Sequence, residues 1–263
     1  MKTLHIIMPM AGEGSRFKEA GYTVPKPLIN FKGTELYRRS LSSLNIKDYF
    51  NVDDWLQIKY TFIVRKEFID DYNIDKEIKQ YYPEANIITV EKTTRGALET
   101  VMLAEKYMND DECIVSMDCD IQFASIGYVE KLFHKLRLAS CRIPMVLTFY
   151  SNNPIYSFVK VIGNVGMFVA EKTPVSNYAI GGCYYLGEAK YLKQAAQQYI
   201  SDFESGKIKI KELYLSEVIN YIINILDTCI DVYDMNLHYD HYWSFGTPYD
   251  LENYNYDRNI WDA

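Results

Sequence analysis

The sequence predicts an α/β fold with a Rossmann-like, mainly parallel twisted sheet, helices on both of its faces and a small antiparallel patch. Three observations support this prediction. Apolar runs alternate with amphipathic stretches through the first half of the chain. A glycine-rich turn directly follows the first apolar run, and closely spaced apolar segments begin near residue 157. Alternating strands and helices fold into parallel sheets covered by helices, because each right-handed crossover packs back onto the sheet.

The first half of the chain supplies the parallel strands and their crossover helices. Short apolar runs predict strands, and apolar residues at helical spacing, such as Leu36, Leu41 and Leu44, predict helices. We expect strands at 4–8, 60–64, 86–90, 113–117 and 144–149, and helices at 35–44, 66–82, 97–107 and 126–138. Ligands of such sheets bind at the carboxyl ends of strands, where the turn after Met8 and the acidic residues after Met117 fall.

The second half of the chain has a different pattern. Three closely spaced apolar segments predict the antiparallel patch, and two helices, a short strand and a helical tail follow. We expect strands at 157–162, 167–171, 182–186 and 229–233, and helices at 188–203, 210–226 and 250–256. No internal repeat or low-complexity linker interrupts the chain, so a single domain over residues 1–263 is predicted.

Length, charge and cysteine content exclude several classes of protein. The chain has 263 residues, enough for one large core, and its apolar fraction of 48% is that of an ordinary globular protein. A net charge of −7 argues against general nucleic-acid binding. No apolar stretch is long enough to span a bilayer. The five scattered cysteines contain no Cys-x-x-Cys pair, and the four histidines show no ligand spacing. We therefore expect buried free thiols, histidines in surface or local packing positions, and a cytoplasmic protein without nucleic-acid or membrane partners.

The turn after the first strand has the composition of an anion-binding loop. Gly12 and Gly14 allow a phosphate to approach the main chain closely, so that backbone N–H groups can point at it. Arg16 offers a planar fork of donors that suits phosphate oxygens. A Walker loop would need Gly-Lys-Ser/Thr, and a dinucleotide-binding loop would need a third glycine where Phe17 stands. The alternative interpretation of the glycines alone is a tight strand-to-helix turn.

A lysine held between two prolines follows this loop. Pro25 and Pro27 restrict their own φ angles, and Pro27 disfavours a helical conformation for Lys26. A cation on such a stiff segment can meet a phosphate in a single geometry. The loop and the Pro-Lys-Pro step together predict a site for a polyphosphate.

These two blocks resemble the signature of the nucleotidylyltransferases that activate sugar phosphates and related phosphates. That family's pattern reads Gly-x-Gly-Ser/Thr-Arg, a spacer, and then Pro-Lys-Pro-Leu. The chain matches it at Gly12, Gly14, Ser15, Arg16, Pro25, Lys26, Pro27 and Leu28. Weaker similarities continue to Tyr249, so the resemblance covers nearly the whole chain.

The resemblance implies that the two halves of the chain bind different substrates. Residues 1–150 form the nucleotide-binding part and residues 151–263 the acceptor-binding part, with the antiparallel patch on the substrate side. The loop residues Ala11, Gly12, Gly14 and Ser15 bind the nucleotide. The family's properties are also compatible with a homo-oligomer.

Two carboxylates end the predicted strand at 113–117. Mg²⁺, which triphosphate chemistry usually requires, prefers oxygen ligands, often one or two carboxylates plus substrate oxygens. The resemblance places the metal aspartate at Asp120, with Asp118 as its neighbour on the same face of the strand. The alternative is a solvated turn whose acids cap the following helix.

A later motif departs from the family's pattern. Sugar-handling members often supply a second metal aspartate two residues before the glycine of a Gly-Thr step. The chain has Gly246 and Thr247, but Ser244 stands at the aspartate's place. Either Asp118 or Asp240 supplies the second ligand, or a single protein carboxylate suffices.

Two further segments resemble the family's substrate contacts. Thr94, Gly96 and Ala97 match the base-proximal segment, in which a nucleobase lies against a Gly-Ala step and Thr94 either binds the base or caps the helix. Lys172 matches a lysine near the acceptor phosphate. Gly181 and Gly182 match the small residues that line the acceptor site.

The implied reaction is an in-line attack of an acceptor phosphate on the α-phosphorus of a nucleoside triphosphate, with release of pyrophosphate. In this reading Arg16 holds the β- and γ-phosphates, Lys26 bridges the α-phosphate and the attacking phosphate, and Mg²⁺ is the cofactor. The triphosphate is CTP, UTP or dTTP. The acceptor is a small phosphate such as a sugar 1-phosphate, used for surface-polysaccharide precursors.

Three other functions remain open from the sequence. The first is a CTP-dependent cytidylyltransferase for a non-sugar phosphate, of the phosphocholine type, which the serine at position 244 favours. The second is a nucleotide-sugar-dependent glycosyltransferase that uses Asp118-Cys119-Asp120 as its Asp-x-Asp motif. The third is a non-catalytic nucleotide-binding regulator. The Pro-Lys-Pro step argues against the second, because glycosyl transfer needs no triphosphate clamp.

Overall fold

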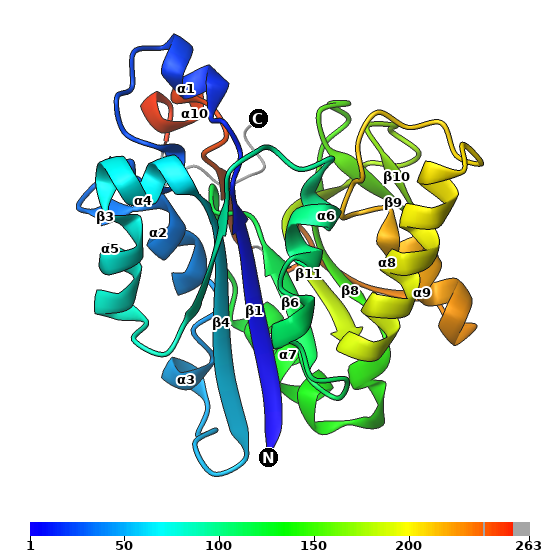
Figure 1. Ribbon diagram of the computed structural model, residues 1–263. Helices are drawn as coiled ribbons and strands as arrows, with labels where there is room; N and C mark the ends of the chain where they lie inside the picture. The colour runs from blue at the N-terminus through cyan, green and yellow to red at the C-terminus, as the bar shows by residue number, and fades with distance from the viewer. Residues whose placement is uncertain (239, 255–263) are drawn as a thin grey trace.

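A large mixed sheet forms the centre of the molecule (Figure 1). The computed structural model describes residues 1–238 and 240–254. Within them, the sheet has nine strands in the order β5-β4-β1-β6-β11-β8-β12-β10-β9. These strands are β1 (Lys2–Met10), β4 (Leu56–Arg65), β5 (Asn86–Val90), β6 (Cys113–Met117), β8 (Met145–Tyr150), β9 (Ser157–Ile162), β10 (Val165–Glu171), β11 (Tyr178–Glu188) and β12 (Ile230–Asp234).

The sheet is parallel on one side and largely antiparallel on the other. β5, β4, β1 and β6 are mutually parallel neighbours, as is the pair β8 and β12. β11 runs antiparallel to both β6 and β8, and β10 runs antiparallel to β9 and β12. The α/β class is therefore confirmed, whereas the antiparallel part is larger than the expected patch. The reason lies in the connections, because the chain passes from β8 to β11 through the β9–β10 hairpin and not through a crossover helix.

Helices cover both faces of this sheet. One face packs against α2 (Leu36–Ser42), α3 (Ile46–Tyr49), α4 (Lys66–Tyr72), α5 (Ile74–Tyr81) and α7 (Ile126–Arg137). The other face packs against α6 (Ala97–Met102), α8 (Ala189–Glu204) and α9 (Val218–Leu226). Neighbouring strand residues divide between these two cores. Ile6 packs on the first face and Ile7 on the second, as side-chain alternation along a strand requires.

Several predicted helices are shorter in the structure. The helix expected at 66–82 is interrupted at Asn73, which has a left-handed conformation with φ of 53° and separates α4 from α5. The helix at 97–107 ends at Met102 and is followed by a 3₁₀ turn, Glu105–Tyr107. The helix at 210–226 begins only at Val218. Among the described residues, no helix has both the length and the apolar character needed to cross a membrane.

A two-stranded ribbon that the sequence did not reveal joins the two halves of the chain. β7 (Ile121–Ala124) pairs antiparallel with β13 (His241–Ser244). This pairing brings the C-terminal segment back to the end of β6, next to the glycine loop (Figure 1). The tail helix is α10 (Pro248–Glu252), and residues 255 and 256 of the predicted tail helix lie outside the described residues.

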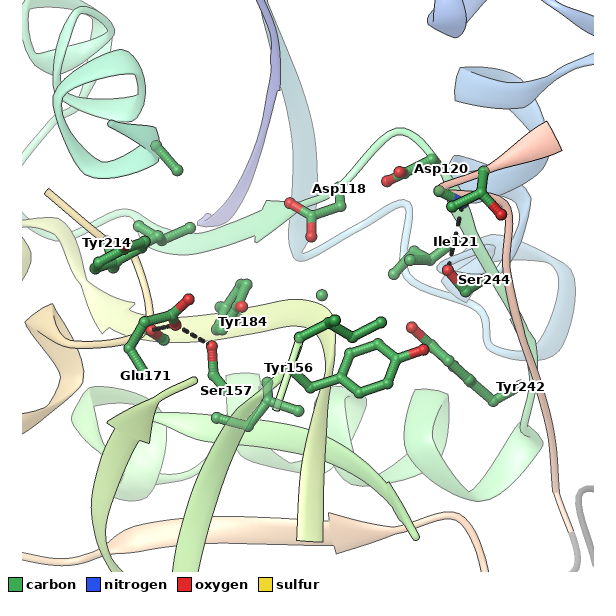
Figure 2. A pocket seen from close by; sticks show the side chains of 18 of the residues that line it. Asp118, Asp120, Ile121, Tyr156, Ser157, Glu171, Tyr184, Tyr214, Tyr242 and Ser244 are labelled. Carbon is green, nitrogen blue, oxygen red and sulfur yellow. Dashed lines mark hydrogen bonds between the residues drawn. The ribbon is translucent and has the colours of Figure 1, made fainter. Parts of the chain in front are cut away.

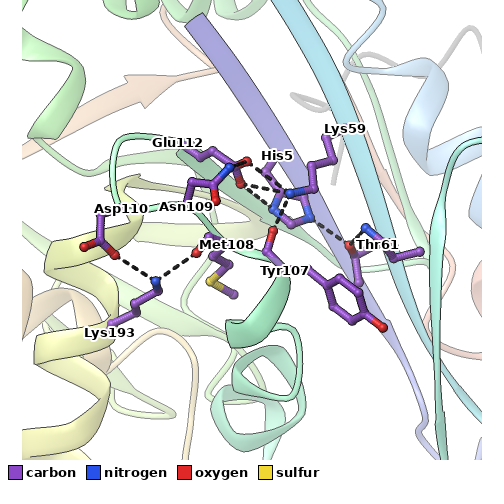
Figure 3. A network of polar contacts seen from close by, with 10 residues as sticks. His5, Lys59, Thr61, Tyr107, Met108, Asn109, Asp110, Glu112 and Lys193 are labelled. Atoms are coloured by element: carbon purple, nitrogen blue, oxygen red, sulfur yellow. Dashed lines mark hydrogen bonds and ion pairs between the residues drawn. The ribbon is translucent and has the colours of Figure 1, made fainter.

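A buried polar network fixes the middle of β1 (Figure 3). The His5 ring is fully buried, with Nδ1 3.0 Å from Glu112 Oε2 and Nε2 2.7 Å from Thr61 Oγ1. Glu112 also accepts from the Lys59 ammonium at 3.0 Å and from the Asn109 amide at 2.9 Å. This histidine is therefore a core residue with local packing partners. Four of the five cysteines are buried free thiols, and Cys229 is half-buried.

Candidate active site

A cavity of about 320 Å³ opens at the carboxyl ends of the parallel strands (Figure 2). Its walls come from both halves of the chain. The first half contributes Arg16, Ala97, Asp118, Asp120 and Ile121, and the second half contributes Ile155, Tyr156, Ser157, Glu171, Ile180, Gly182, Tyr184, Tyr214, Leu215, Ser216, Tyr242, Ser244, Gly246, Thr247 and Asp250. The cavity is therefore rich in carboxylates and tyrosines, and Arg16 is the one cation among these lining residues.

The glycine loop leads from β1 to the short helix α1 (Ser15–Glu19). Gly14 stands immediately before this helix with φ of 62°, in the left-handed region that favours glycine. A methyl group on Gly14 would contact Lys26 Cβ at 3.5 Å, so the loop passes directly beside the lysine. Arg16 is exposed and reaches the cavity, while Ala11, Gly12 and Ser15 are not among its lining residues.

Lys26 forms an ion pair with Asp120 at the edge of this cavity. Its ammonium lies 2.8 Å from Asp120 Oδ2, and both side chains are largely shielded from solvent. Burial by itself lowers the pKa of Lys26, but the attraction of the Asp120 carboxylate outweighs burial and raises that pKa. Lys26 is therefore a permanent cation. The two prolines that flank it are buried, and Lys26 begins the 3₁₀ turn Lys26–Leu28, so the expected non-helical conformation of Lys26 is wrong.

Asp118 lies two residues before Asp120 in the sequence, at the end of β6. Its N–H donates to the carbonyl oxygen of Gly182 in β11 at 2.9 Å. Gly182 has φ of +70°, and a Cβ there would lie 2.6 Å from Asp118 Oδ2, so only glycine admits the carboxylate at this position. Burial, together with the nearby Asp120 carboxylate, raises the pKa of Asp118 to about 7. Figure 2 shows both carboxylates directed toward the same cavity.

The C-terminal segment adds oxygen atoms next to Asp120. The Phe245 N–H donates to the Asp120 carbonyl oxygen at 2.6 Å, which continues the β7–β13 ribbon. A Cβ built on Gly246 would lie 3.4 Å from Asp120 Oδ2 and 3.5 Å from Ser244 Oγ. Ser244 therefore lies beside Asp120, where the resemblance expects an aspartate. Asp250 reaches the same corner and caps α10, since its Oδ2 accepts from the Thr247 N–H at 2.8 Å.

The donor set fits a magnesium ion better than a transition metal. Asp118 and Asp120 are hard oxygen donors in one cavity, and a divalent cation offsets both the burial and the mutual repulsion that raise the pKa of Asp118. No group of three or more His, Cys, Asp or Glu side chains within 1–238 and 240–254 is arranged to hold a metal ion. Mg²⁺ commonly uses one or two protein carboxylates and completes its shell with water and substrate oxygens.

The segment that was expected to contact a nucleobase contacts the protein backbone. Gly96 does not line the cavity; a Cβ on it would lie 2.5 Å from the carbonyl oxygen of Leu213. Thr94 Oγ1 donates to the Gly96 carbonyl oxygen at 3.0 Å and lies 2.6 Å from Thr100 Oγ1. Gly96 is itself the N-cap residue of α6, so Thr94 does not cap this helix. Ala97, the first residue of α6, does line the cavity.

A carboxylate with two serine partners forms the far end of the cavity (Figure 2). Glu171 Oε2 accepts from the hydroxyls of Ser157 and Ser216, the latter at 2.7 Å. Tyr184 and Tyr214 lie beside it. Because two hydroxyl groups already hold one oxygen of Glu171, the carboxylate keeps a fixed orientation toward the cavity.

The structure brings together only part of the predicted acceptor residues. Gly182 lines the cavity, whereas Gly181 is buried behind it, and a Cβ there would lie 2.5 Å from Leu147 Cδ2. Lys172 does not line the cavity; its half-exposed ammonium lies 4.7 Å from the centre of the Tyr214 ring and 3.9 Å from Glu171 Oε1. Lys172 is therefore at the rim, next to the acceptor end.

Sequence reasoning missed many residues that line the cavity. They include Tyr156, Ser157, Glu171, Tyr184, Tyr214, Ser216, Tyr242 and Asp250. Tyrosine is too frequent in this chain, at 24 copies, to indicate a site by its presence. Asp250 had a usable signal, because it follows the Gly246-Thr247 step at capping distance.

Comparisons with known proteins show similarity in three dimensions. No protein-family model matches the chain, and no curated protein is similar to it in sequence. A nucleoside-diphosphate-sugar pyrophosphorylase from Vibrio cholerae RC9 superposes with a TM-score of 0.73 and 22% identity, over 94% of this chain and 98% of the other.

Two further solved structures are similar. A protein described as a glucose-1-phosphate thymidylyltransferase from Bacillus anthracis has a TM-score of 0.70 and 17% identity, over 98% of each chain. An inositol-1-phosphate CTP transferase from T. maritima has a TM-score of 0.68 and 18% identity, over 95% of this chain and 91% of the other. All three are nucleotidylyltransferases by name. The chain therefore has the fold of the nucleotidylyltransferases, as the resemblance in its glycine loop predicted.

Proposed function

We propose that the protein is a nucleotidylyltransferase that joins a nucleoside triphosphate to a small phosphorylated acceptor and releases pyrophosphate. The observation that carries this proposal is the Lys26–Asp120 pair of 2.8 Å at the edge of the cavity. A permanent cation and a candidate metal ligand meet there, beside the glycine loop, where two phosphates must be brought together. The names of the three similar structures support the same reaction class.

The chain's own residues supply positioning and charge in this reaction. Arg16 and the loop amides hold the β- and γ-phosphates of CTP, UTP or dTTP. Lys26 lies between the α-phosphate and the acceptor phosphate and offsets their repulsion. An acceptor oxygen attacks the α-phosphorus, and the bond from this phosphorus to the bridging oxygen breaks, so that pyrophosphate leaves with that oxygen. A phosphate is already a nucleophile at neutral pH, so positioning and electrostatics are sufficient.

Asp118 and Asp120 are the residues that would hold Mg²⁺. The ion supplies charge stabilisation at the α-phosphate when it is bound. An ion held there would share the Asp120 carboxylate with the Lys26 ammonium, which contacts Oδ2. Ser244 contributes a neutral oxygen beside Asp120 in place of the usual second aspartate.

We further assign residues 1–150 to the nucleotide and 151–263 to the acceptor. The parallel, Rossmann-like half of the sheet ends at the glycine loop and at Asp118, while the antiparallel half supplies Glu171 and Tyr184. Two of the three similar structures have names that specify a sugar nucleotide or a sugar phosphate, which supports a sugar phosphate as the acceptor. We propose in addition a cytoplasmic role, alone or as a homo-oligomer, in making precursors for surface polysaccharides.

A substrate matrix tests the proposed reaction. CTP, UTP, dTTP, GTP and ATP are each combined with glucose 1-phosphate, inositol 1-phosphate, phosphocholine and phosphoethanolamine, and pyrophosphate release is measured with Mg²⁺. Release that needs both substrates supports the proposal. Nucleotide binding without turnover indicates a regulator, and transfer of sugar from a nucleotide sugar without pyrophosphate indicates a glycosyltransferase.

A non-sugar acceptor with an ammonium group is a second candidate, and one observation favours it. The acceptor end of the cavity has the Glu171 carboxylate and several tyrosines, and no cation lies among its lining residues. At its rim the chain's own Lys172 ammonium already rests between the Tyr214 ring and Glu171. Aromatic rings with a carboxylate attract alkylammonium groups.

The matched pair of phosphocholine and its neutral isostere, 3,3-dimethylbutyl phosphate, tests this second candidate. A site that binds a cationic acceptor prefers phosphocholine over the neutral isostere by about tenfold or more in kcat/KM. The reason is that desolvated cation–π contacts contribute about 1–2 kcal/mol. Equal use of both compounds, or a preference for glucose 1-phosphate, decides against it.

A further inference from the structure

The N-terminus of α6 and the segment 211–216 cross with almost no space between their backbones. A Cβ built on Gly96 would lie 2.5 Å from the carbonyl oxygen of Leu213 and 2.6 Å from its nitrogen. The fully buried Leu213 donates its N–H to the Arg95 carbonyl oxygen at 2.9 Å and accepts from the Leu98 N–H at 3.0 Å. Gly96 has φ of +150°, which also favours glycine. Two hydrogen bonds therefore attach this segment to the start of α6, and the absence of a side chain at Gly96 leaves room for the close approach.

The residues directly after this crossing form a wall of the acceptor end. Tyr214, Leu215 and Ser216 all line the cavity. Ser216 is buried, and its hydroxyl donates to Glu171 at 2.7 Å. The Tyr214 hydroxyl lies 3.4 Å from Lys172 Nζ. The position of the Leu213 backbone thus determines the positions of two lining residues. These are Ser216, whose hydroxyl binds Glu171, and Tyr214, whose ring forms part of the cavity wall.

We propose that Gly96 is a positioning residue for the acceptor, and that it acts through Leu213. By admitting the Leu213 backbone, Gly96 holds Tyr214, Leu215 and Ser216 against the acceptor end. This inference rests on the proposed nucleotidylyltransferase function. It differs from the role that the resemblance implies, in which this glycine leaves room for a nucleobase.

The local hydrogen bonds decide which side of the crossing moves if it is forced apart. The Gly96 carbonyl oxygen accepts from the Thr100 N–H at 3.1 Å, from Thr100 Oγ1 at 3.1 Å and from Thr94 Oγ1 at 3.0 Å. The Arg95 N–H donates to the Glu99 carboxylate at 2.6 Å. Residues 211–216, in contrast, form an irregular connection between α8 and α9. We therefore expect a side chain at position 96 to displace the segment 211–216 more than the start of α6, with loss of the hydrogen bond from the Leu98 N–H to Leu213.

Two alanine substitutions separate the acceptor role from a nucleotide role. In Gly96→Ala the added methyl group clashes with the backbone of Leu213. Gly12→Ala is the comparison variant, because it changes the glycine loop and not the acceptor end. A Cβ at Gly12 has no protein atom within 4 Å, so the substitution causes no clash within the chain. CTP and UTP affinities are measured by calorimetry, and acceptor KM values by pyrophosphate release with glucose 1-phosphate, inositol 1-phosphate and phosphocholine.

We expect Gly96→Ala to raise the acceptor KM by about tenfold or more, because small misplacements of positioning groups cost up to about a hundredfold. The nucleotide affinity of this variant stays within about twofold of the wild type. Gly12→Ala shows the opposite split, with weaker nucleotide binding and an unchanged acceptor KM. A Gly96→Ala variant that weakens CTP and UTP binding, with no change in acceptor KM, overturns the inference.

Ser216→Ala tests the same wall without the backbone clash. It removes one of the two hydroxyl groups that hold Glu171, and the charged hydrogen bond that is lost predicts an acceptor KM about tenfold higher. Nucleotide affinity is expected to stay unchanged. If Ser216→Ala leaves the acceptor KM at the wild-type value, the wall does not position the acceptor and the inference fails.

Hydrogen exchange separates a failure of this inference from a failure of the proposed function. Gly96→Ala is expected to speed amide exchange in residues 213–216 and at Leu98, whose N–H donates to Leu213, and to leave the other amides of α6 protected. If the wild type releases no pyrophosphate with any pair in the panel, the proposed function fails for those substrates. In that case the positioning inference is still decided, because exchange in 213–216 that matches the wild type contradicts it.

Discussion

Lys26 shows how much of the site depends on one residue held by its neighbours in sequence. Pro25 and Pro27 are buried, so the lysine cannot swing freely, and its ammonium meets Asp120 at 2.8 Å. An ion pair of this kind positions both partners before any substrate binds. The exposed Arg16 lies on the short helix α1 and has no proline on either side of it.

Removal of this lysine should abolish turnover without unfolding the protein. We expect Lys26→Ala to lower kcat by at least about a hundredfold, since the repulsion between two phosphates is no longer offset. The melting temperature should fall by only a few degrees, because the Asp120 carboxylate left without its partner lines the cavity and can be hydrated there. Pyrophosphate release and thermal unfolding are the measurements.

Lys18→Ala is the matched control for that variant. Lys18 lies on α1, the short helix that precedes Lys26, and its ammonium is exposed, 3.9 Å from Glu67 and away from the cavity. Its removal should leave kcat within about twofold. Full activity of Lys26→Ala, or equal losses in both variants, would contradict the assigned role.

His5 predicts a dependence of stability on pH. Burial, with a further contribution from the Lys59 ammonium, lowers the pKa of His5 to about 4, although Glu112 acts in the opposite direction. The folded protein therefore keeps the ring neutral at pH values where the unfolded chain already binds a proton. Stability is full above the ordinary pKa of 6.5 and is lost as the pH falls from there toward 4, by about 3 kcal/mol in total.

Urea denaturation at pH 7.5, 5.5 and 4.5 measures this effect, with His5→Gln as the control. A glutamine can donate to Glu112 and accept from Thr61, but it does not titrate. The free energy of unfolding of the wild type should fall more steeply with decreasing pH than that of the variant. Parallel curves would show that His5 does not carry the pH dependence.

At the scale of elements, the ends of helices decide much of the local structure. Asn73 separates α4 from α5 with a left-handed conformation, and Leu213 uses its N–H and carbonyl group to bind Arg95 and Leu98 in place of helical partners. In both places a backbone contact or conformation outweighs a favourable apolar spacing. Helix propensity is a weak preference that tertiary contacts commonly override.

The start of α7 offers a test at this scale. Ser125 accepts from the Tyr128 N–H at 2.9 Å and lies 2.5 Å from Asp240 Oδ2, which ties the helix to the segment before β13. Ser125→Ala should lower the free energy of unfolding by about 1–2 kcal/mol, because it removes a cap and a charged hydrogen bond. Ser205→Ala, at the exposed end of α8, should change it by less than about 0.5 kcal/mol. Equal effects in urea denaturation would argue against the capping role.

At the scale of the whole molecule, the cavity exists because the C-terminal segment returns to the middle of the chain. β13 pairs with β7, and Phe245 binds the Asp120 backbone, so the carboxylates after β6 face residues that follow them by more than a hundred positions. Substrate binding should therefore stabilise the molecule as a unit.

Nucleotide and Mg²⁺ together should raise the melting temperature. A ligand at about a hundred times its Kd adds about 2.7 kcal/mol, which corresponds to roughly 5 °C for a chain of this size. Asp120→Asn should remove the part of the shift that needs Mg²⁺, whereas Asp110→Asn, an exposed residue paired with Lys193, should keep it. A shift in the wild type that is the same with Mg²⁺ and with a chelator would exclude a metal at Asp118 and Asp120.

The amino-acid sequence by itself determined the local features of this protein. The strands at 86–90, 113–117 and 157–162 have the predicted bounds, because each is a short apolar run flanked by polar residues. The glycine loop, Lys26 and the carboxylates after β6 could also be located from sequence, since their chemistry depends on neighbours in the chain.

Only the tertiary structure decided the direction of β11, the β7–β13 ribbon, the wall formed by Tyr214 and Ser216, and the partner of Gly96. Each depends on contacts between residues far apart in sequence, and local periodicity carries no information about them. The glycine at position 96 makes the difference plain. A glycine at this position indicated that another group comes close to it. Only the packing of the whole chain shows that this group is the backbone of Leu213.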